Sequence, residues 1–121
     1  VNIVDSIVDD KGNVVKEIRV RQGRRIISKS TADRIKDLME AATIYGTGTE
    51  AGMEYYGGAA GKTGSAETGR RGVVHAWFAG YFPVNDPRYA VAVFVEGGQY
   101  GGRAAAPVFG KIARRMRDMG Y

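Results

Sequence analysis

The sequence predicts an α+β fold, with one five-stranded antiparallel sheet and two helices packed on one of its faces. Three observations carry this prediction. Short runs rich in Val, Ile and aromatic residues alternate with Gly, Asn and Asp turn sequences. Two segments repeat apolar residues at helical spacing, one ending near residue 46 and one following Pro107. Residues 89–95 are apolar on both faces, which is typical of a strand covered on both sides.

The N-terminal part is expected to form a β-hairpin and a helix. Residues 2–8 and 14–20 are rich in Val and Ile and flank the turn sequence Asp-Asp-Lys-Gly-Asn, and residues 21–29 are a polar linker. Ser30 and Asp33 resemble a capping box with the shorter acid, which predicts the helix start. The helix should end near Tyr45, with Gly46 as its C-cap. Its apolar face would carry Ile35, Leu38, Met39 and Ala42.

The remaining elements follow a Gly-rich loop at residues 47–60, a length that usually marks a functional or mobile loop. Pro107 should occupy the first turn of the last helix, where its missing N–H costs little. The strands are predicted at 61–67, 73–84 and 89–95, with turns at 68–72 and 85–87 and a glycine-rich loop at 97–102. The apolar row of the last helix would be Val108, Ile112 and Met116.

Size and composition limit the classes of function. The 121 residues suit one domain, and the 44% apolar and 26% charged fractions are ordinary for a globular protein. No apolar run reaches the roughly 18 residues of a membrane span. There is no cysteine, and the single His75 leaves too few ligands for zinc. We therefore expect neither a metal nor a cofactor.

The net charge of +5 raises the question of an anionic partner. Solvated loops and a helix end, where cations complement the helix dipole, are the simpler interpretation. Attraction to a cell-wall polymer or to phospholipid headgroups is the alternative, and no nucleic-acid partner is expected. Much of the charge lies in Arg19, Arg21, Arg24 and Arg25 and in Lys111, Arg114, Arg115 and Arg117.

The tripeptide Lys62-Thr63-Gly64 is the most informative motif, and it allows three interpretations. The simplest is a strand with a surface lysine. The second is a phosphate-binding P-loop, which needs Gly, four residues and then Gly-Lys-Ser/Thr. Tyr56 stands where the first glycine of that motif should be. The third is the Lys-Thr-Gly element of serine acyl-transferases that act on penicillin and on D-Ala-D-Ala peptides.

The neighbouring sequence favours the third interpretation. Gly-Lys-Thr-Gly-Ser-Ala-Glu at 61–67 is followed by His-Ala-Trp-Phe-Ala-Gly-Tyr-Phe-Pro at 75–83 and by Ala-Ala-Pro-Val-Phe at 105–109. Over nearly all of residues 1–121 this order resembles the C-terminal part of the transpeptidase domain of penicillin-binding proteins. The His-Ala-Trp-Phe stretch and the Glu-Gly-Gly before the last helix resemble the class B enzymes. The resemblance implies that residues 1–121 are the C-terminal fragment of one serine β-lactamase/transpeptidase-like domain.

The resemblance implies roles for four residues. Lys62 would be catalytic, giving positive potential to the substrate carboxylate and to the proton relay around the nucleophile. Thr63 would offer its hydroxyl to that carboxylate, and Gly64 would let the acyl group approach the strand. The N–H of Ser65 would be one of two oxyanion-hole donors, and its carbonyl would receive the substrate amide. The family more often has Thr at the position of Ser65.

The motifs that supply the nucleophile in this family do not occur in these residues. The family needs Ser-x-x-Lys, whose serine is acylated, and Ser-x-Asn. Both precede Lys-Thr-Gly in the family, so the resemblance implies that the N-terminal remainder of the same domain is a partner. Without it, the chain would form no acyl-enzyme. The serines that begin neither motif are Ser6, Ser28, Ser30 and Ser65.

The implied function is that of a peptidoglycan D,D-transpeptidase that cross-links stem peptides through a serine acyl-enzyme and is inhibited by β-lactams. It would work at the extracytoplasmic face of the bacterial membrane, with its anchor in the N-terminal part. A β-lactamase or D,D-carboxypeptidase of the same fold is the nearest alternative. A non-catalytic basic binding module is the alternative from another class.

Four further side chains lie near the motif in sequence. His75 is expected to be a packed or hydrogen-bonded structural residue rather than a catalytic one. Trp77, on the same strand face, is expected in the core rather than as a ligand platform. Tyr55 and Tyr56 either line the cleft or are exposed on their loop.

Overall fold

The computed structural model describes residues 4–18 and 23–121, and it confirms the α+β class with antiparallel strands. Residues 2–3 and 19–20 of the predicted hairpin strands, and with them Arg19 and Arg21, lie outside the described residues. The strands are β1 (Ser6–Val8), β2 (Val14–Glu17), β3 (Ala60–Glu67), β4 (Val74–Phe82) and β5 (Tyr89–Val95). The helices are α1 (Lys29–Ile44) and α2 (Gly101–Asp118), with the 3-10 turns η1 (Thr49–Ala51) and η2 (Glu54–Tyr56).

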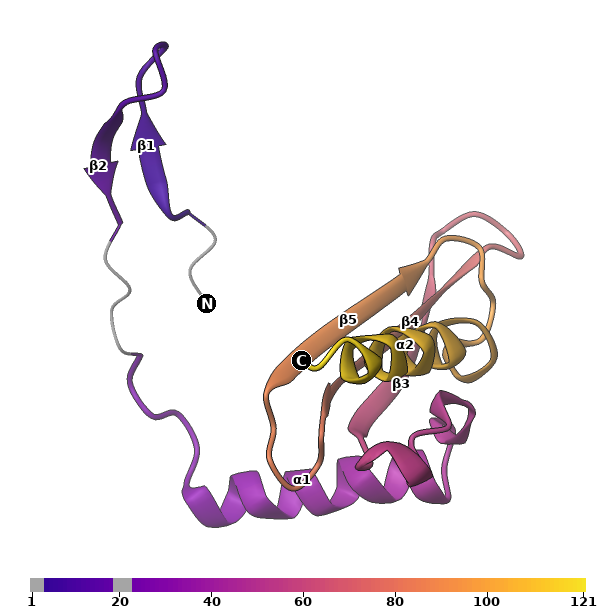
Figure 1. Cartoon of the computed structure of the whole chain (residues 1–121). Helices are drawn as coiled ribbons and strands as arrows, with labels where there is room; N and C mark the ends of the chain where they lie inside the picture. The colour runs from indigo at the N-terminus through magenta and orange to yellow at the C-terminus, as the bar shows by residue number, and fades with distance from the viewer. Residues whose placement is uncertain (1–3, 19–22) are drawn as a thin grey trace.

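The five strands form two sheets rather than the expected single one (Figure 1). β1 pairs with β2, and a second sheet has the order β3-β4-β5. The hairpin is closed at its turn by Asp9, whose carboxylate accepts hydrogen bonds from the Lys11 N–H (2.9 Å) and from both the backbone and the side chain of Asn13. The side-chain bond from Asn13 is the largest cause of the lowered pKa of Asp9. The turn sequence thus acts as predicted.

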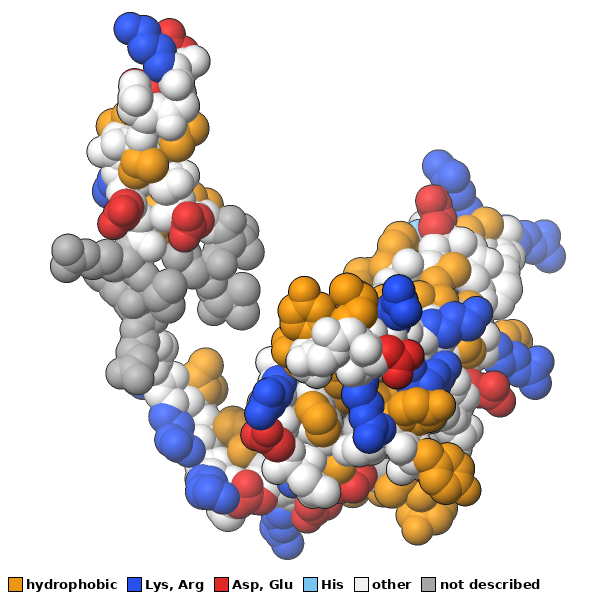
Figure 2. Space-filling view, viewed as in Figure 1, with side chains coloured by type: hydrophobic (Ala, Val, Ile, Leu, Met, Phe, Trp, Pro, Cys, Tyr) orange, Lys and Arg blue, Asp and Glu red, His pale blue; other side chains and the backbone are white. Residues whose placement is uncertain are grey.

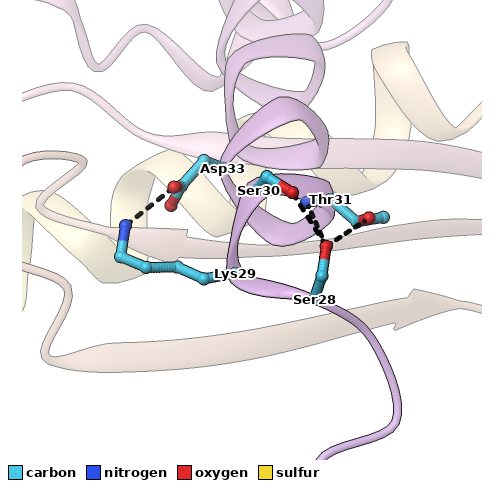
Figure 3. Close-up of polar contacts among 5 residues, drawn as sticks. All are labelled: Ser28, Lys29, Ser30, Thr31 and Asp33. Atoms are coloured by element: carbon cyan, nitrogen blue, oxygen red, sulfur yellow. Dashed lines mark hydrogen bonds and ion pairs between the residues drawn. The ribbon is translucent and has the colours of Figure 1, made fainter.

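Helix α1 begins earlier than the sequence predicts, because Ser28 caps it. The Ser28 backbone is extended, and its Oγ accepts a hydrogen bond from the Thr31 N–H (3.0 Å), as an N-cap residue does (Figure 3). The predicted capping box is therefore wrong. Ser30 lies inside the helix, and Asp33 instead pairs with Lys29 (2.7 Å) one turn before it.

The end of α1 is where the sequence predicts it, at Tyr45, whose N–H bonds to the Ala41 carbonyl. Gly46 is not the C-cap; it is needed because a Cβ there would lie 2.9 Å from the backbone of Ala42. Thr43 anchors this end to the sheet, since its hydroxyl donates to the carbonyl of Ala59 (2.6 Å), the residue before β3. α1 thus meets the sheet at the start of the edge strand.

Helix α2 covers one face of the three-stranded sheet (Figure 1) and makes the core there. Phe109 packs against Phe78 and Phe82 of β4, with ring centroids 4.7 Å and 5.7 Å apart. The predicted apolar row is wrong, because Val108 and Ile112 remain more than a third exposed (38% and 37%). The buried row of α2 consists of small residues and one phenylalanine: Ala105, Ala106, Phe109, Gly110 and Ala113.

Small residues are required because α2 lies so close to its neighbours. A Cβ on Gly101 would lie 2.5 Å from the Trp77 carbonyl oxygen, and a Cβ on Gly110 would overlap the Ala51 carbonyl. The close approach of Gly101 to the Trp77 carbonyl also explains why α2 starts at Gly101, within the segment 97–102 that was predicted to be a loop. Pro107 consequently lies in the second turn rather than the first, where it removes the N–H that would bond to the Arg103 carbonyl.

Candidate active site

The motif Lys62-Thr63-Gly64 lies in β3, an edge strand of the three-stranded sheet. Because side chains alternate along a strand, Lys62 lies on one face of the sheet, and Thr63 and Ser65 lie on the other. The register agrees, since Thr63 is opposite the buried Phe78 and Lys62 is opposite the exposed Ala79. Along the edge itself, no strand of the described residues pairs with the outward backbone N–H and C=O groups of alternate residues.

Lys62 is exposed in the described part of the chain, and its Nζ donates a hydrogen bond to the carbonyl of the next residue, Thr63 (2.8 Å). On the same face, Gly64 lies opposite Trp77, whose Cβ is 3.3 Å from the position that a Gly64 Cβ would take. Because glycine has no side chain, the strand backbone beside Lys62 stays accessible, and a flat group can lie against it.

Thr63 and Ser65 line a cavity of about 450 Å³ between β3 and the N-terminus of α2. The Thr63 hydroxyl lies 2.6 Å from the hydroxyl of Thr47, and the Gly101 N–H donates to Ser65 Oγ (3.4 Å). Hydroxyls, a helix N-terminus and the cation of Arg103 make this cavity suited to a carboxylate. The other lining residues are Glu50, Tyr100 and Gly102.

Sequence reasoning missed Thr47 and Arg103 as cavity residues. Thr47 belongs to the short Gly-Thr-Gly sequence after α1, but its contact with Thr63 spans 16 positions and depends on how the loop returns to the sheet. Arg103 lies between the predicted glycine-rich loop at 97–102 and the predicted first turn of the last helix, so no predicted element placed it at the cavity. Cleft lining and loop exposure were the two alternatives for Tyr55 and Tyr56, and neither lines this cavity. Tyr55 is 88% exposed, and Tyr56 packs against Arg114 and Arg117.

Two arginines of α2 hold the loop that follows Thr47. Arg114 donates from Nη1 to the carbonyls of Ala51 and Gly52 (both 2.9 Å), and its guanidinium lies 5.6 Å from the centre of the Tyr56 ring. The Arg117 guanidinium also lies 5.6 Å from the Tyr56 ring centre, and its Nη1 donates to the Tyr55 carbonyl (3.2 Å). Part of the basic C-terminal cluster therefore has a structural role.

His75 and Trp77 lie on the face of the sheet opposite α2. His75 is hydrogen-bonded as predicted: its Nδ1 accepts from the Gly97 N–H (3.1 Å), and its ring meets Phe94 edge-on. Trp77 also packs on Phe94, with centroids 4.6 Å apart. The prediction that Trp77 is a core residue is wrong for the described chain, because 41% of Trp77 and 48% of Phe94 are exposed.

The described residues offer no group of three or more His, Cys, Asp or Glu side chains arranged to hold a metal ion. Over the same residues, no helix is long and apolar enough to cross a membrane. On the face drawn in Figure 2, Lys and Arg side chains are scattered among acidic and hydrophobic ones instead of gathering in one patch.

Comparisons with known proteins place the chain in a family. A family model described as the penicillin-binding protein transpeptidase domain matches residues 1–114. The chain belongs to that family. The peptidoglycan D,D-transpeptidase PbpA of Mycolicibacterium smegmatis is 35% identical over 96% of the chain, and stage V sporulation protein D of Bacillus subtilis is 34% identical over 75% of it. These relatives are class B penicillin-binding proteins, as the sequence predicts.

Solved structures agree with this assignment. The D,D-transpeptidase domain of a peptidoglycan glycosyltransferase from Eggerthella lenta matches 96% of the chain with a TM-score of 0.70 and 30% identity. Penicillin-binding protein A of M. tuberculosis, solved as an imipenem acyl-enzyme complex, matches 93% with a TM-score of 0.66 and 28% identity. The chain spans 27% and 25% of these two structures, and 25% and 15% of the two relatives above.

Proposed function

We propose that residues 1–121 are the C-terminal part of a transpeptidase domain and that the complete protein is a peptidoglycan D,D-transpeptidase. A serine of the complete domain would attack the carbonyl of the penultimate D-Ala of a stem peptide and release the terminal D-Ala. An amine of a second stem peptide would then attack the ester, restoring the serine hydroxyl and completing the cross-link. The observation that carries the proposal is the edge strand β3, with Lys62 on one face and the hydroxyl-lined cavity on the other.

Lys62 would act through its charge. An ammonium beside the reacting serine lowers the energy of proton transfer away from the hydroxyl, and it attracts the substrate carboxylate. The Lys62 side chain can reach toward an approaching segment, because the hydrogen bond it makes within residues 4–18 and 23–121 goes to an exposed backbone carbonyl of its own strand. Thr63 would donate its hydroxyl to the substrate carboxylate within the cavity.

Ser65 would act through its backbone. In an edge strand, outward N–H and C=O groups can bind an extended peptide as a further strand. An N–H aimed at the developing oxyanion typically contributes about 3 kcal/mol to the transition state. Gly64 supports this role, since it has no side chain of its own that would block the acyl group.

A second segment of the same domain, carrying Ser-x-x-Lys and Ser-x-Asn, would cover the face of the sheet that holds Trp77 and Phe94. That face is apolar and exposed, although such aromatic pairs usually bury most of their area. The face also carries Lys62. A segment seated there would therefore bring its serine to the lysine and remove the aromatic rings from water in one step.

The complete protein would be anchored in the bacterial membrane by a segment outside residues 1–121 and would face the cell wall. Its class B relatives are membrane-anchored cell-wall enzymes. β-Lactams would acylate the same serine, as the acyl-enzyme complex of penicillin-binding protein A illustrates for that protein. A β-lactamase or D,D-carboxypeptidase differs from a transpeptidase in the acceptor of the acyl group. Water accepts it in the first two enzymes, and an amine accepts it in the transpeptidase.

The test uses the complete protein and a fluorescent penicillin, with the product followed on a denaturing gel. Covalent labelling is expected, and it should be lost when the Ser-x-x-Lys serine is replaced by alanine. Lys62→Ala should slow labelling by about a hundredfold or more, because a positioned acid–base group contributes at least that much. Lys111→Ala, which removes an exposed lysine of α2, should label at the wild-type rate.

Failure of the intact protein to label would contradict the proposed acyl-enzyme, and an unchanged rate in Lys62→Ala would remove Lys62 from the mechanism. Product analysis with a stem peptide and an acceptor amine then separates the enzymes of this fold. Cross-linked peptide supports the transpeptidase, and free D-Ala without cross-linking indicates a carboxypeptidase. Rapid release of hydrolysed penicillin indicates a β-lactamase.

A further inference from the structure

We propose that Thr47 is a positioning residue for the substrate carboxylate, acting through the hydroxyl of Thr63. This inference rests on the proposed function, in which Thr63 donates to that carboxylate. The two hydroxyl oxygens are 2.6 Å apart, and both side chains line the cavity beside β3. Thr47 comes from the loop after α1 and not from the strand that carries the motif.

The bound carboxylate determines which of the two hydroxyls donates its proton to the other. Each hydroxyl has one proton to donate, and a carboxylate can only accept. When the proton of Thr63 goes to the carboxylate, the oxygen of Thr63 is left as the acceptor for the proton of Thr47. The result is a chain running from Thr47 through Thr63 to the substrate, in which each hydrogen bond polarises the next.

The loop that carries Thr47 is held on several sides, so its hydroxyl is placed before the ligand arrives. Gly48 donates its N–H to the Ala42 carbonyl (2.9 Å) at the end of α1. Gly102 of α2 packs on the Thr47 carbonyl so closely that no Cβ fits between them. Arg114 then fixes the next turn through two backbone carbonyls. A rigid support of this kind reduces the ordering cost of binding.

The hydrogen bond from Thr47 also limits the side-chain rotation of Thr63. A threonine without this partner can turn its hydroxyl toward the strand backbone or toward solvent. With the partner, the hydroxyl oxygen stays 2.6 Å from Thr47, and its proton is directed into the cavity. Removal of the Thr47 hydroxyl is therefore expected to weaken carboxylate recognition while leaving the fold intact.

The experiment measures the second-order rate of acylation of the complete protein by benzylpenicillin and by its methyl ester. Thr47→Val keeps the shape and removes the hydroxyl; it should slow acylation by benzylpenicillin about fivefold, as expected for the loss of a hydrogen bond between two neutral hydroxyls. Thr47→Ser should recover most of the rate. Thr49→Val, in the same loop but outside the cavity, should match wild type.

Two further comparisons separate positioning from a general structural effect. The penalty of Thr47→Val should shrink to within about twofold for the methyl ester, which has no carboxylate, and within about twofold when Thr63 is already Val. The inference would be overturned if Thr47→Val slowed acylation by the ester as much as it slows acylation by benzylpenicillin. It would also be overturned if Thr47→Val slowed the Thr63→Val variant as much as it slows the wild type. An unchanged rate in Thr47→Val when Thr63→Val is slow would overturn it as well. An unchanged rate in Thr63→Val would instead contradict the proposed role of Thr63.

Discussion

Gly110, in the middle of α2, shows how a single missing side chain sets the distance between two elements. Glycine inside a helix costs about 1 kcal/mol relative to alanine, so its presence needs a reason. The reason here is the carbonyl of Ala51, which occupies the space that a Gly110 Cβ would take. Gly101 and Gly102 make comparable contacts with the Trp77 carbonyl and the Thr47 carbonyl. These glycines bring α2 against both the strand and the loop of the site.

Gly110→Ala should therefore destabilise the complete protein, despite the better helix propensity of alanine. Overpacking of this kind typically lowers the free energy of unfolding by about 1–3 kcal/mol. Urea denaturation followed by circular dichroism measures it. Gly23→Ala, whose added Cβ would have no atom of the described residues within 4 Å, is the matched control. Equal stability of Gly110→Ala and the wild type would show that α2 does not pack as closely as described.

At the scale of elements, the loop between α1 and β3 depends on α2 for its position. Arg114 satisfies two backbone carbonyls of this loop, and Tyr56 lies against both Arg114 and Arg117. Ala51, Met53 and Ala59 of this loop reach the core, but most of its other residues are exposed, and such a segment would otherwise open readily. Its connection to α2 thus extends to Thr47, which begins the same loop.

Arg114→Ala is expected to increase the hydrogen exchange of the amides at residues 49–57 and to lower stability by about 1–2 kcal/mol, because one part-buried and one exposed carbonyl lose their charged donor. Arg115→Ala removes a neighbouring exposed charge of the same helix and should change neither quantity. Mass spectrometry of the exchanged, digested protein measures the loop directly. Equal protection of residues 49–57 in the two variants would contradict the structural role of Arg114.

The elements also show what sequence patterns can predict. The turn at Asp9, the end of α1 and the strand with Lys62 follow from local rules of capping, turn chemistry and alternation. The start of α2 does not, because the paired glycines that suggest a loop are selected by contact with the sheet. For the same reason the buried row of α2 consists of alanines and glycine, and a search for large apolar residues misses it.

The same distinction between local sequence rules and tertiary contacts applies to the candidate site. Lys62, Thr63, Gly64 and Ser65 are consecutive, so their motif is visible in the sequence and their shared strand was predicted. Thr47 and Arg103 join them only through tertiary structure, with Thr47 reaching Thr63 across 16 positions. No periodicity or spacing in a single sequence encodes a contact of that kind.

At the scale of the whole molecule, the described residues cover one face of the three-stranded sheet and leave the other uncovered. Strand β5 shows this clearly, since Val93 is 6% exposed under α2 and Phe94 on the other face is 48% exposed. The sequence predicted cover on both faces, and the described residues provide it on one. A further segment of the same domain seated on the uncovered face would complete the fold and the catalytic site together.

Trp77, the single tryptophan of residues 1–121, reports on this cover. With 5-fluorotryptophan at this position and other tryptophans of the complete protein replaced, the ¹⁹F resonance should show little solvent isotope shift. The same residue in the chain of residues 1–121 should show a large one, because 41% of Trp77 is exposed there. Equal solvent shifts in both proteins would mean that nothing covers this face.

The most direct test of the account is the structure of the complete protein acylated by benzylpenicillin. We expect the carbonyl oxygen of the acyl group about 3 Å from the Ser65 backbone nitrogen, the penicillin carboxylate at the Thr63 hydroxyl, and Lys62 Nζ beside the acylated serine. An acyl group bound away from β3, with Lys62 remote from the modified serine, would contradict the account.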